Sequence, residues 1–212
     1  MSLNPPPEDE TSRRHWWWRP GWGPGTRCWT LHIVFGAQPG RSSLLEAVDA
    51  LEQVRGLPGW DAVPRRWLHL TMQGVGFADQ LDAEEVAAVA QAAGRALAGT
   101  GPLVLELGPP LIDAEGVNLP AAHPRLDGVR LRVREVLAQV LGKHRVEESA
   151  GWRPHVTMAY AAQDGAALAP VRALLAKAPV RALVEVDHVS LIRLHRDRGV
   201  YEWDEEIRVP LA

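Results

Sequence analysis

The sequence predicts an α+β fold in which antiparallel sheets are covered by helices. Segments with the alternation of strands and segments with helical spacing follow one another along the chain, in the order strand, helix, strand, helix, strands, helix, strand, helix, hairpin. In addition, the pattern His-x-Thr-Met occurs twice, each time in a predicted strand that follows a predicted helix. The second half of the chain therefore repeats the first in outline.

The first half is predicted to contain two strands and two helices. Residues 26–35 are rich in β-forming side chains and predict a strand. A helix is expected to begin at Ser42 or Ser43, either of which can cap it, and to end near residue 54. Residues 65–77 form the strand with the first motif, and the alanine-rich residues 82–97 form the second helix.

The second half is predicted to contain two helices and several strands. These elements are a strand at 103–107, a hairpin arm at 111–119, a helix that follows His123-Pro124 and ends near residue 141, the second motif strand at 152–160, a helix at 166–176, a strand at 180–194 and a returning strand at 200–209. The helix that follows Pro124 carries Arg125, Arg130, Arg132 and Arg134. We expect them mostly on its exposed side, because a charge run on a helix is usually a solvated face; an RNA-binding stripe is the alternative.

Each motif places an imidazole and a hydroxyl on one face of its strand, since residues i and i+2 of a strand share a face. In the first copy these are His69 and Thr71, and in the second they are His155 and Thr157. The two predicted polar faces consist of Trp67, His69, Thr71 and Gln73, and of Arg153, His155, Thr157 and Ala159. If the two strands lie side by side, two imidazoles and two hydroxyls line one cleft.

Such a cleft suits general acid–base chemistry. Histidine exchanges protons near neutral pH, so a neutral and a protonated imidazole can serve as base and acid. The two threonine hydroxyls can donate hydrogen bonds to oxygens that gain charge. This set of groups suits in-line displacement at a phosphodiester without a metal. The alternative is that each histidine is an ordinary packed strand residue.

Composition excludes several other classes of function. The net charge of −3 provides no global basic field for long nucleic acids, which favours a small substrate or a short RNA end. The single cysteine, Cys28, cannot form an internal disulfide, and the chain lacks a long apolar segment, so we expect a cytoplasmic protein that does not enter a membrane. Histidines with zinc-type spacing, a phosphate-binding glycine loop and a dinucleotide fingerprint are all missing from the sequence, so we expect no metal and no cofactor.

The N-terminal residues 1–25 differ from the rest of the chain, being rich in Pro and Trp, and we expect a flexible segment. Four tryptophans lie between residues 16 and 22, beside Arg13, Arg14 and Arg19. One interpretation is that the rings stack on bases of a single strand, and another is that they anchor the segment over a groove of the domain. In a mixed case the anchored segment forms part of the rim of the cleft.

The motifs His69-Leu70-Thr71 and His155-Val156-Thr157 resemble the two motifs of the two-histidine (2H) phosphoesterases, also known as 2′-5′ RNA ligase-like proteins. The resemblance extends from about Cys28 to the end of the chain, with Gln73 as a polar departure from the usual apolar pattern. It implies a bilobal α+β domain at 26–212, with two pseudo-symmetric lobes whose antiparallel sheets line a central cleft.

The same resemblance implies a metal-independent phosphodiesterase that hydrolyses 2′,3′-cyclic phosphate or 2′-5′ phosphodiester bonds of nucleotides or RNA ends, with 2′-5′ RNA ligation as the reverse reaction. The expected catalytic residues are His69, Thr71, His155 and Thr157. We further expect Arg153 and Trp17 to bind the substrate, and the protein to be a monomer. The alternatives are a non-catalytic module that binds RNA ends or nucleotides, and a structural protein in which the repeated motif is a coincidence of packing.

Overall fold

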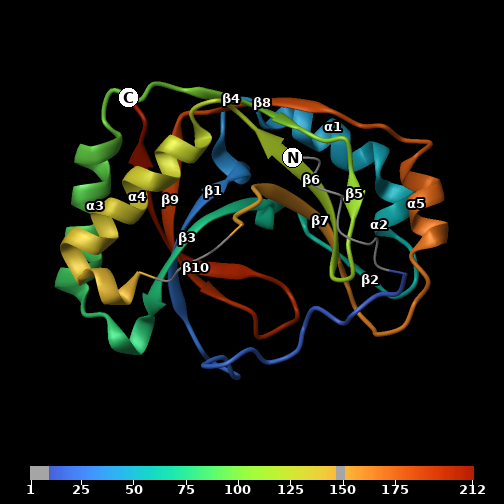
Figure 1. The fold of residues 1–212 in the computed structure, drawn as a ribbon, viewed down its shortest axis with the longest axis horizontal. Helices are drawn as coiled ribbons and strands as arrows, with labels where there is room; N and C mark the ends of the chain where they lie inside the picture. The colour runs from blue at the N-terminus through green and yellow to red at the C-terminus, as the bar shows by residue number, and fades with distance from the viewer. Residues whose placement is uncertain (1–9, 147–150) are drawn as a thin grey trace, which may run out of the picture.

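The computed structural model describes residues 10–146 and 151–212, so the expectation of flexibility for residues 1–9 lies outside the described residues. It contains two antiparallel sheets that face each other (Figure 1). One sheet has four strands in the order β10-β9-β1-β3. The other has six strands, in the order β2-β7-β6-β4-β8, with β5 beside β6. The predicted α+β fold with antiparallel sheets is confirmed.

The four-stranded sheet is built from both ends of the described chain. Its strands are β1 (Cys28–Val34), β3 (His69–Phe77), β9 (His188–His195) and β10 (Glu202–Pro210). The helices α3 (Ala83–Leu97) and α4 (Leu126–Leu141) lie beside this sheet (Figure 1). Asp82 caps α3 in a reciprocal capping box with Glu85, which agrees with the predicted start of this helix at residue 82.

The six-stranded sheet contains the second motif. Its strands are β2 (Trp60–Ala62), β4 (Leu103–Leu107), β5 (Leu111–Ile112), β6 (Gly116–Ala122), β7 (His155–Ala161) and β8 (Ala182–Val186). The helices on this side of the molecule are α1 (Arg41–Ala50), α2 (Glu52–Arg55) and α5 (Ala169–Leu175) (Figure 1). None of the described helices is long and apolar enough to cross a membrane.

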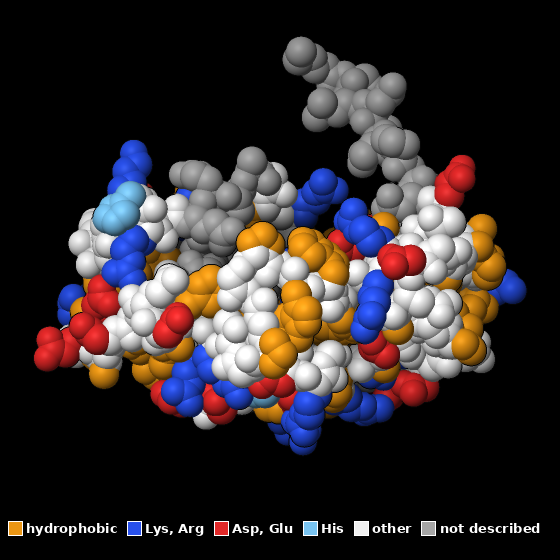
Figure 2. Space-filling view, turned by 90° about the horizontal axis from the view of Figure 1, so that it is seen from below, with side chains coloured by type: hydrophobic (Ala, Val, Ile, Leu, Met, Phe, Trp, Pro, Cys, Tyr) orange, Lys and Arg blue, Asp and Glu red, His pale blue; other side chains and the backbone are white. Residues whose placement is uncertain are grey.

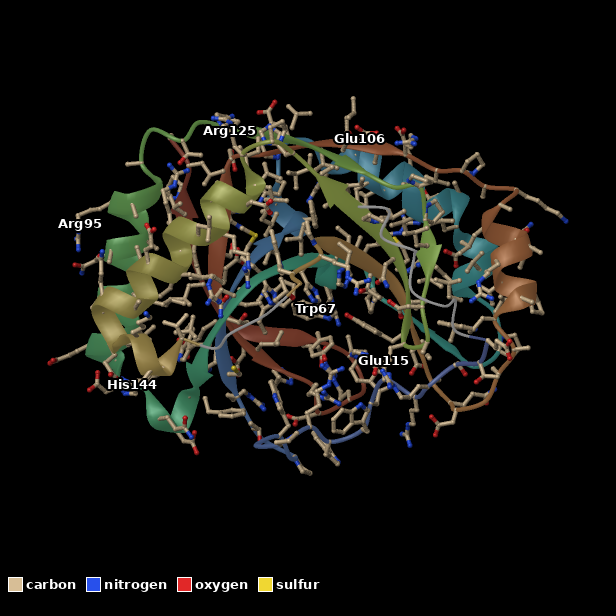
Figure 3. All side chains as sticks on the ribbon, in the orientation of Figure 1. Trp67, Arg95, Glu106, Glu115, Arg125 and His144 are labelled. Carbon is tan, nitrogen blue, oxygen red and sulfur yellow. The ribbon has the colours of Figure 1, made fainter. Side chains whose placement is uncertain are left out.

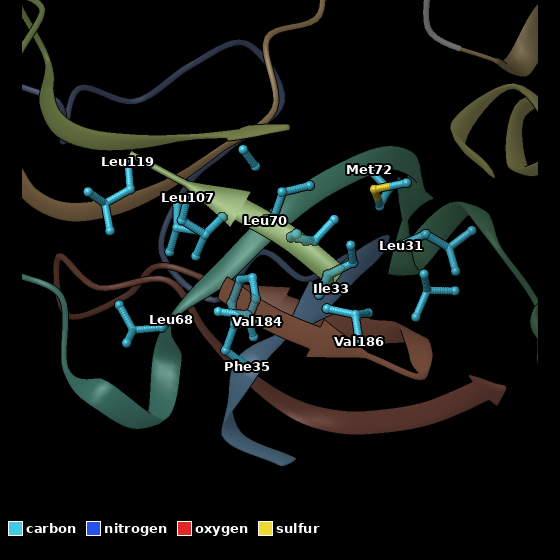
Figure 4. Close-up of a cluster of buried hydrophobic side chains, with 14 of the residues drawn as sticks. Leu31, Ile33, Phe35, Leu68, Leu70, Met72, Leu107, Leu119, Val184 and Val186 are labelled. Atoms are coloured by element: carbon cyan, nitrogen blue, oxygen red, sulfur yellow. The ribbon is translucent and has the colours of Figure 1, made fainter. Parts of the chain in front are cut away.

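One buried cluster joins the two sheets into a single packed unit (Figure 4). Leu31 and Ile33 of β1 and Leu70 of β3 are fully buried, and so are Leu107 and Val184 of the other sheet. These side chains occupy the apolar positions of the predicted strand alternation. The sheets are thereby held in fixed positions relative to each other, which also fixes the strands that carry the two motifs.

The prediction of one strand at 180–194 was wrong, because the chain changes sheets within this segment. β8 pairs with β4 and β9 pairs with β1, with Asp187 between them. The backbone N–H of Asp187 donates to Gln38 Oε1 at 3.1 Å, and its carbonyl accepts from Leu211 N at 2.8 Å. Neither backbone group of Asp187 is therefore available to pair with a neighbouring strand. The segment contains neither Gly nor Pro, so nothing in the sequence indicates the break.

The arginines of α4 do not form a solvated face as expected. Arg130 is only 9% exposed, and its Nε donates to the Met72 carbonyl at 2.9 Å. Gln73 accepts at Oε1 from both Arg130 Nη2 (3.1 Å) and Arg134 Nη1 (2.8 Å). The polar Gln73, unexpected in a motif strand, therefore ties β3 to α4.

Residues 10–25, which we call the strap, are hydrogen-bonded to the domain although we expected a flexible segment. Ser12 N donates to the Ala166 carbonyl at 2.8 Å, and His15 N donates to the Ala161 carbonyl at 2.9 Å. Ser12 O in turn accepts from Gly165 N at 2.8 Å. These bonds occupy the backbone just before α5, which begins at Ala169 instead of the predicted residue 166.

Candidate active site

A β-bulge interrupts each motif strand at the methionine that follows the threonine. In β3, Leu31 pairs with Gln73 but His32 pairs with Thr71, which leaves Met72 as the extra residue. In β7, Val117 pairs with Ala159 but Asn118 pairs with Thr157, which leaves Met158 as the extra residue. An extra residue of this kind reverses the alternation of faces beyond it. The two halves of the chain therefore share a backbone irregularity as well as a motif.

Because of the bulges, the polar faces predicted from strict strand alternation were partly wrong. Gln73 and Ala159 do not face the same side as the histidine and threonine of their strands, and neither lines the cavity between the sheets. The residue three positions after each threonine takes that place, namely Gly74 in β3 and Tyr160 in β7. Both bulged residues are methionines and not glycines, so nothing in the sequence indicated the bulges. We therefore expected strict alternation, which was wrong.

Both motifs line one cavity of about 790 Å³. His69 and Thr71 reach it from the four-stranded sheet, whereas His155 and Thr157 reach it from the six-stranded sheet. The two strands thus face each other from different sheets instead of lying side by side. Trp17 of the strap also lines the cavity. Arg153, the other expected substrate-binding residue, is exposed and does not line it.

The two imidazoles are oriented by the same local hydrogen bond. Nδ1 of His69 lies 2.7 Å from the carbonyl oxygen of Trp67, and Nδ1 of His155 lies 2.8 Å from that of Arg153. A carbonyl oxygen can only accept, so each Nδ1 carries a hydrogen and donates it. Each Nε2 is then left for proton exchange, as an acid–base pair requires.

His69 is held in an apolar, aromatic environment. Its ring stacks on that of His32 with centroids 4.7 Å apart and planes 3° apart, and the Tyr201 and Trp203 rings lie at 5.9 and 6.1 Å. The pKa of His69 is lowered to about 4, chiefly by burial and to a smaller extent by the nearby His155, against the opposing effect of the hydrogen bond to the Trp67 carbonyl. His69 is therefore neutral at pH 7, whereas His155 is exposed to solvent.

The two threonines differ in their hydrogen bonds. Thr157 Oγ1 donates to Asn118 Oδ1 at 2.8 Å, and Asn118 Nδ2 donates to Asp113 Oδ2 at 3.0 Å. The carboxylate accepts only, so it fixes the orientation of the amide. Thr71 is exposed, and within the described ranges its hydroxyl has no hydrogen-bond partner. Thr71 is thus free to donate to a ligand, while Thr157 must first leave Asn118.

The charged side chains that line the cavity are all arginines, although the whole chain has a net charge of −3. Three arginines line it, Arg19, Arg145 and Arg196, and no Asp or Glu of the described residues does so. Sequence reasoning missed Arg196 and Tyr201, because they lie in no motif and reach the cavity only through the β9–β10 hairpin. Within residues 10–146 and 151–212, no three His, Cys, Asp or Glu side chains form a group that could hold a metal ion.

Comparison with known proteins gives a family and a fold. A family model described as the 2′-5′ RNA ligase superfamily matches residues 41–198, which include both motifs. No curated protein matches the chain. The fold is similar to that of TT0787 of Thermus thermophilus, with a TM-score of 0.60 and 19% identity over 86% of this chain and 97% of that one.

Two further structures have the same fold. E. coli LigT complexed with 3′-AMP matches with a TM-score of 0.54 and 20% identity, over 87% of this chain and 98% of that one. The MHV ns2 PDE domain matches with a TM-score of 0.53 and 13% identity, over 80% of this chain and 99% of that one.

Proposed function

The chain belongs to the 2′-5′ RNA ligase superfamily, and we propose that it is a metal-independent phosphodiesterase acting on 2′,3′-cyclic phosphates or 2′-5′ linkages of nucleotides or RNA ends. The observation that carries this proposal is the convergence of both imidazoles, both hydroxyls and three arginines on one cavity without a carboxylate. A phosphodiester is an anion, so such a lining favours it electrostatically. The similar fold of LigT, complexed with 3′-AMP, supports a nucleotide substrate.

We assign the role of base to His69 and that of acid to His155. Burial keeps His69 neutral, so its Nε2 can accept a proton from a water molecule that attacks phosphorus. As the new P–O bond forms, the bond to the ribose oxygen breaks, and protonated His155 gives its Nε2 proton to that oxygen. The reaction leaves His69 protonated and His155 neutral, and exchange with solvent restores both. With the 5′-hydroxyl of a second nucleotide in place of water, the same step opens a 2′,3′-cyclic phosphate: the P–O5′ bond forms, the P–O3′ bond breaks, and the 3′ oxygen takes the proton of His155, which leaves a 2′-5′ linkage.

Thr71 and Thr157 are assigned to the non-bridging phosphate oxygens, which gain charge in the transition state. Trp17 is assigned to the nucleoside. Its ring lines the cavity and remains 48% exposed, which leaves area for stacking on a base.

The test is hydrolysis, in EDTA, of a panel of 2′,3′-cyclic nucleotides and a 2′-5′-linked dinucleotide. We expect activity that His69→Ala and His155→Ala each reduce by about 10²-fold or more, in line with general acid–base contributions. His144→Ala is the matched control, because this exposed histidine does not line the cavity. Activity that survives both site substitutions would contradict the assignment, and binding without turnover across the panel would favour the non-catalytic module.

A further inference from the structure

The strap forms part of the wall of the cavity that holds both motifs, and it lies outside the residues that the family model matches. Figure 2 shows this face of the molecule, where exposed hydrophobic side chains lie beside Lys and Arg. Trp17 and Arg19 both line the cavity that holds the two motif histidines, and both also line the adjoining cavity that reaches His155 and Thr157. The strap therefore supplies part of the wall on both sides of the second motif.

Besides the backbone bonds described above, Glu115 and Arg196 of the domain bind the part of the strap that lines the cavity. Glu115, at the tip of the β5–β6 hairpin beside the strap (Figure 3), accepts from Arg13 at 2.7 Å, His15 at 3.0 Å and Arg19 at 3.0 Å. Arg196, only 3% exposed, donates to the Trp17 carbonyl at 2.6 Å. Its guanidinium also lies 5.5–5.8 Å from the rings of Trp16, Trp18, Trp22 and Tyr201.

The three guanidinium groups of the cavity differ in their capacity to bind a further anion. Arg145 uses both terminal nitrogens, donating to Glu85 at 2.6 Å and to the Gln80 carbonyl at 2.8 Å. Arg196 is buried among the strap's rings. Arg19 makes one ion pair, through Nη2, and its side chain remains 38% exposed. Its Nη1 makes no hydrogen bond among the described residues, and its Nε makes none either but is itself buried.

The local charge points the same way. Glu115 is one carboxylate facing two guanidinium groups of the strap, those of Arg13 and Arg19. The two arginines share this one carboxylate, because the other carboxylate of the adjoining cavity, Asp113, accepts from Asn118 and from backbone N–H groups. Arg19 is the member of the pair that lines the cavity with both histidines. The Trp17 ring, 5.6 Å below the Arg19 guanidinium, limits its movement.

We infer that the strap is a substrate-recognition element and that Arg19 binds the phosphate group of the substrate. This inference rests on the proposed function for the identity of the substrate. It gives the phosphate a cation that neither motif provides. A guanidinium with spare donors is suited to such an anion, because it can offer two parallel N–H groups to two phosphate oxygens.

The experiment compares Arg19→Gln with Arg13→Gln in the full chain. Both changes remove an ion pair to Glu115, and both arginines line the adjoining cavity, but only Arg19 also lines the cavity that holds the two histidines. We expect Arg19→Gln to lower kcat/KM by about 10- to 100-fold, mainly through KM, because it removes a hydrogen bond to a charged group. Arg19→Lys should recover part of the loss, and Arg13→Gln should stay within about twofold of wild type.

A binding measurement separates this inference from the proposed function. Quenching of tryptophan fluorescence would report binding of adenosine 3′-monophosphate and of adenosine, which lacks the phosphate. We expect Arg19→Gln to weaken the nucleotide by about 10-fold and adenosine hardly at all. Nucleotide binding that depends on Arg19 without any turnover would refute the proposed function but retain the inference. Equal effects of Arg13→Gln and Arg19→Gln, or unchanged nucleotide binding in Arg19→Gln, would overturn the inference.

Discussion

The lowered pKa of His69 predicts an unusual pH dependence of activity. A base must be neutral to accept a proton, so activity falls as the pH drops through the pKa of His69, which is about 4. At pH 5.5 a histidine with that pKa is about 97% neutral, whereas one with the ordinary pKa of about 6.5 is about 9% neutral. The difference is roughly tenfold in the concentration of active enzyme.

The assay is kcat/KM on a 2′,3′-cyclic nucleotide between pH 4 and 8, with circular dichroism at each pH to verify folding. We expect the acid limb near pH 4. Trp203→Ala should move the limb upward, because it removes one of the rings that shield His69 from water. An acid limb near pH 6.5 in the wild type would refute the reasoning, since it would mean that burial does not control the base.

Three further predictions concern the threonines, the β3–α4 contact and two glycines. Thr71→Val should lower kcat/KM by about 10²-fold. Thr157→Val should lower it by less, because the Thr157 hydroxyl already donates to the amide of Asn118. Steady-state kinetics that give the opposite order would contradict this. Gln73→Leu should lower the free energy of unfolding by about 2 kcal/mol in urea titrations, because two guanidinium groups of α4 lose a shared acceptor. An unchanged midpoint would refute the role of Gln73 in joining β3 to α4. Gly94→Ala, where a methyl group meets open space inside α3, should stabilise by about 0.5–1 kcal/mol. In Gly40→Ala the added methyl group would overlap the backbone of β8, so this variant should lower the free energy of unfolding by about 1–3 kcal/mol. Equal melting temperatures for the two glycine variants would contradict this geometry.

The elements and the motif residues were predictable because their evidence is local. The alanine-rich composition of residues 82–97 located α3, whose predicted start at Asp82 is its capping residue, and strand alternation located the strand at 103–107. The repeated motif brought His69 and His155 together as candidates, and the structure places both on one cavity. Neither inference needed knowledge of the tertiary fold.

The remaining features depend on tertiary contacts that a pattern does not record. The bulges at Met72 and Met158 follow from strand pairing, and no glycine marks them. Arg153 was favoured by strand alternation, yet it lies outside the strand and is exposed. Arg196 reaches the cavity through the β9–β10 hairpin, and Arg19 reaches it because the strap is anchored on the domain. The Trp-rich composition of the strap allowed this anchoring as one interpretation, but it did not indicate that Arg19 would line the cavity.

The most direct test of the acid–base pair is a double-mutant cycle of His69→Ala and His155→Ala on kcat for one active substrate of the panel. If both imidazoles act in the same step, the double variant should be about as slow as the slower single variant, because residues that act as a unit are not additive. Losses that multiply in the double variant would show that the two histidines contribute independently, and would contradict the account.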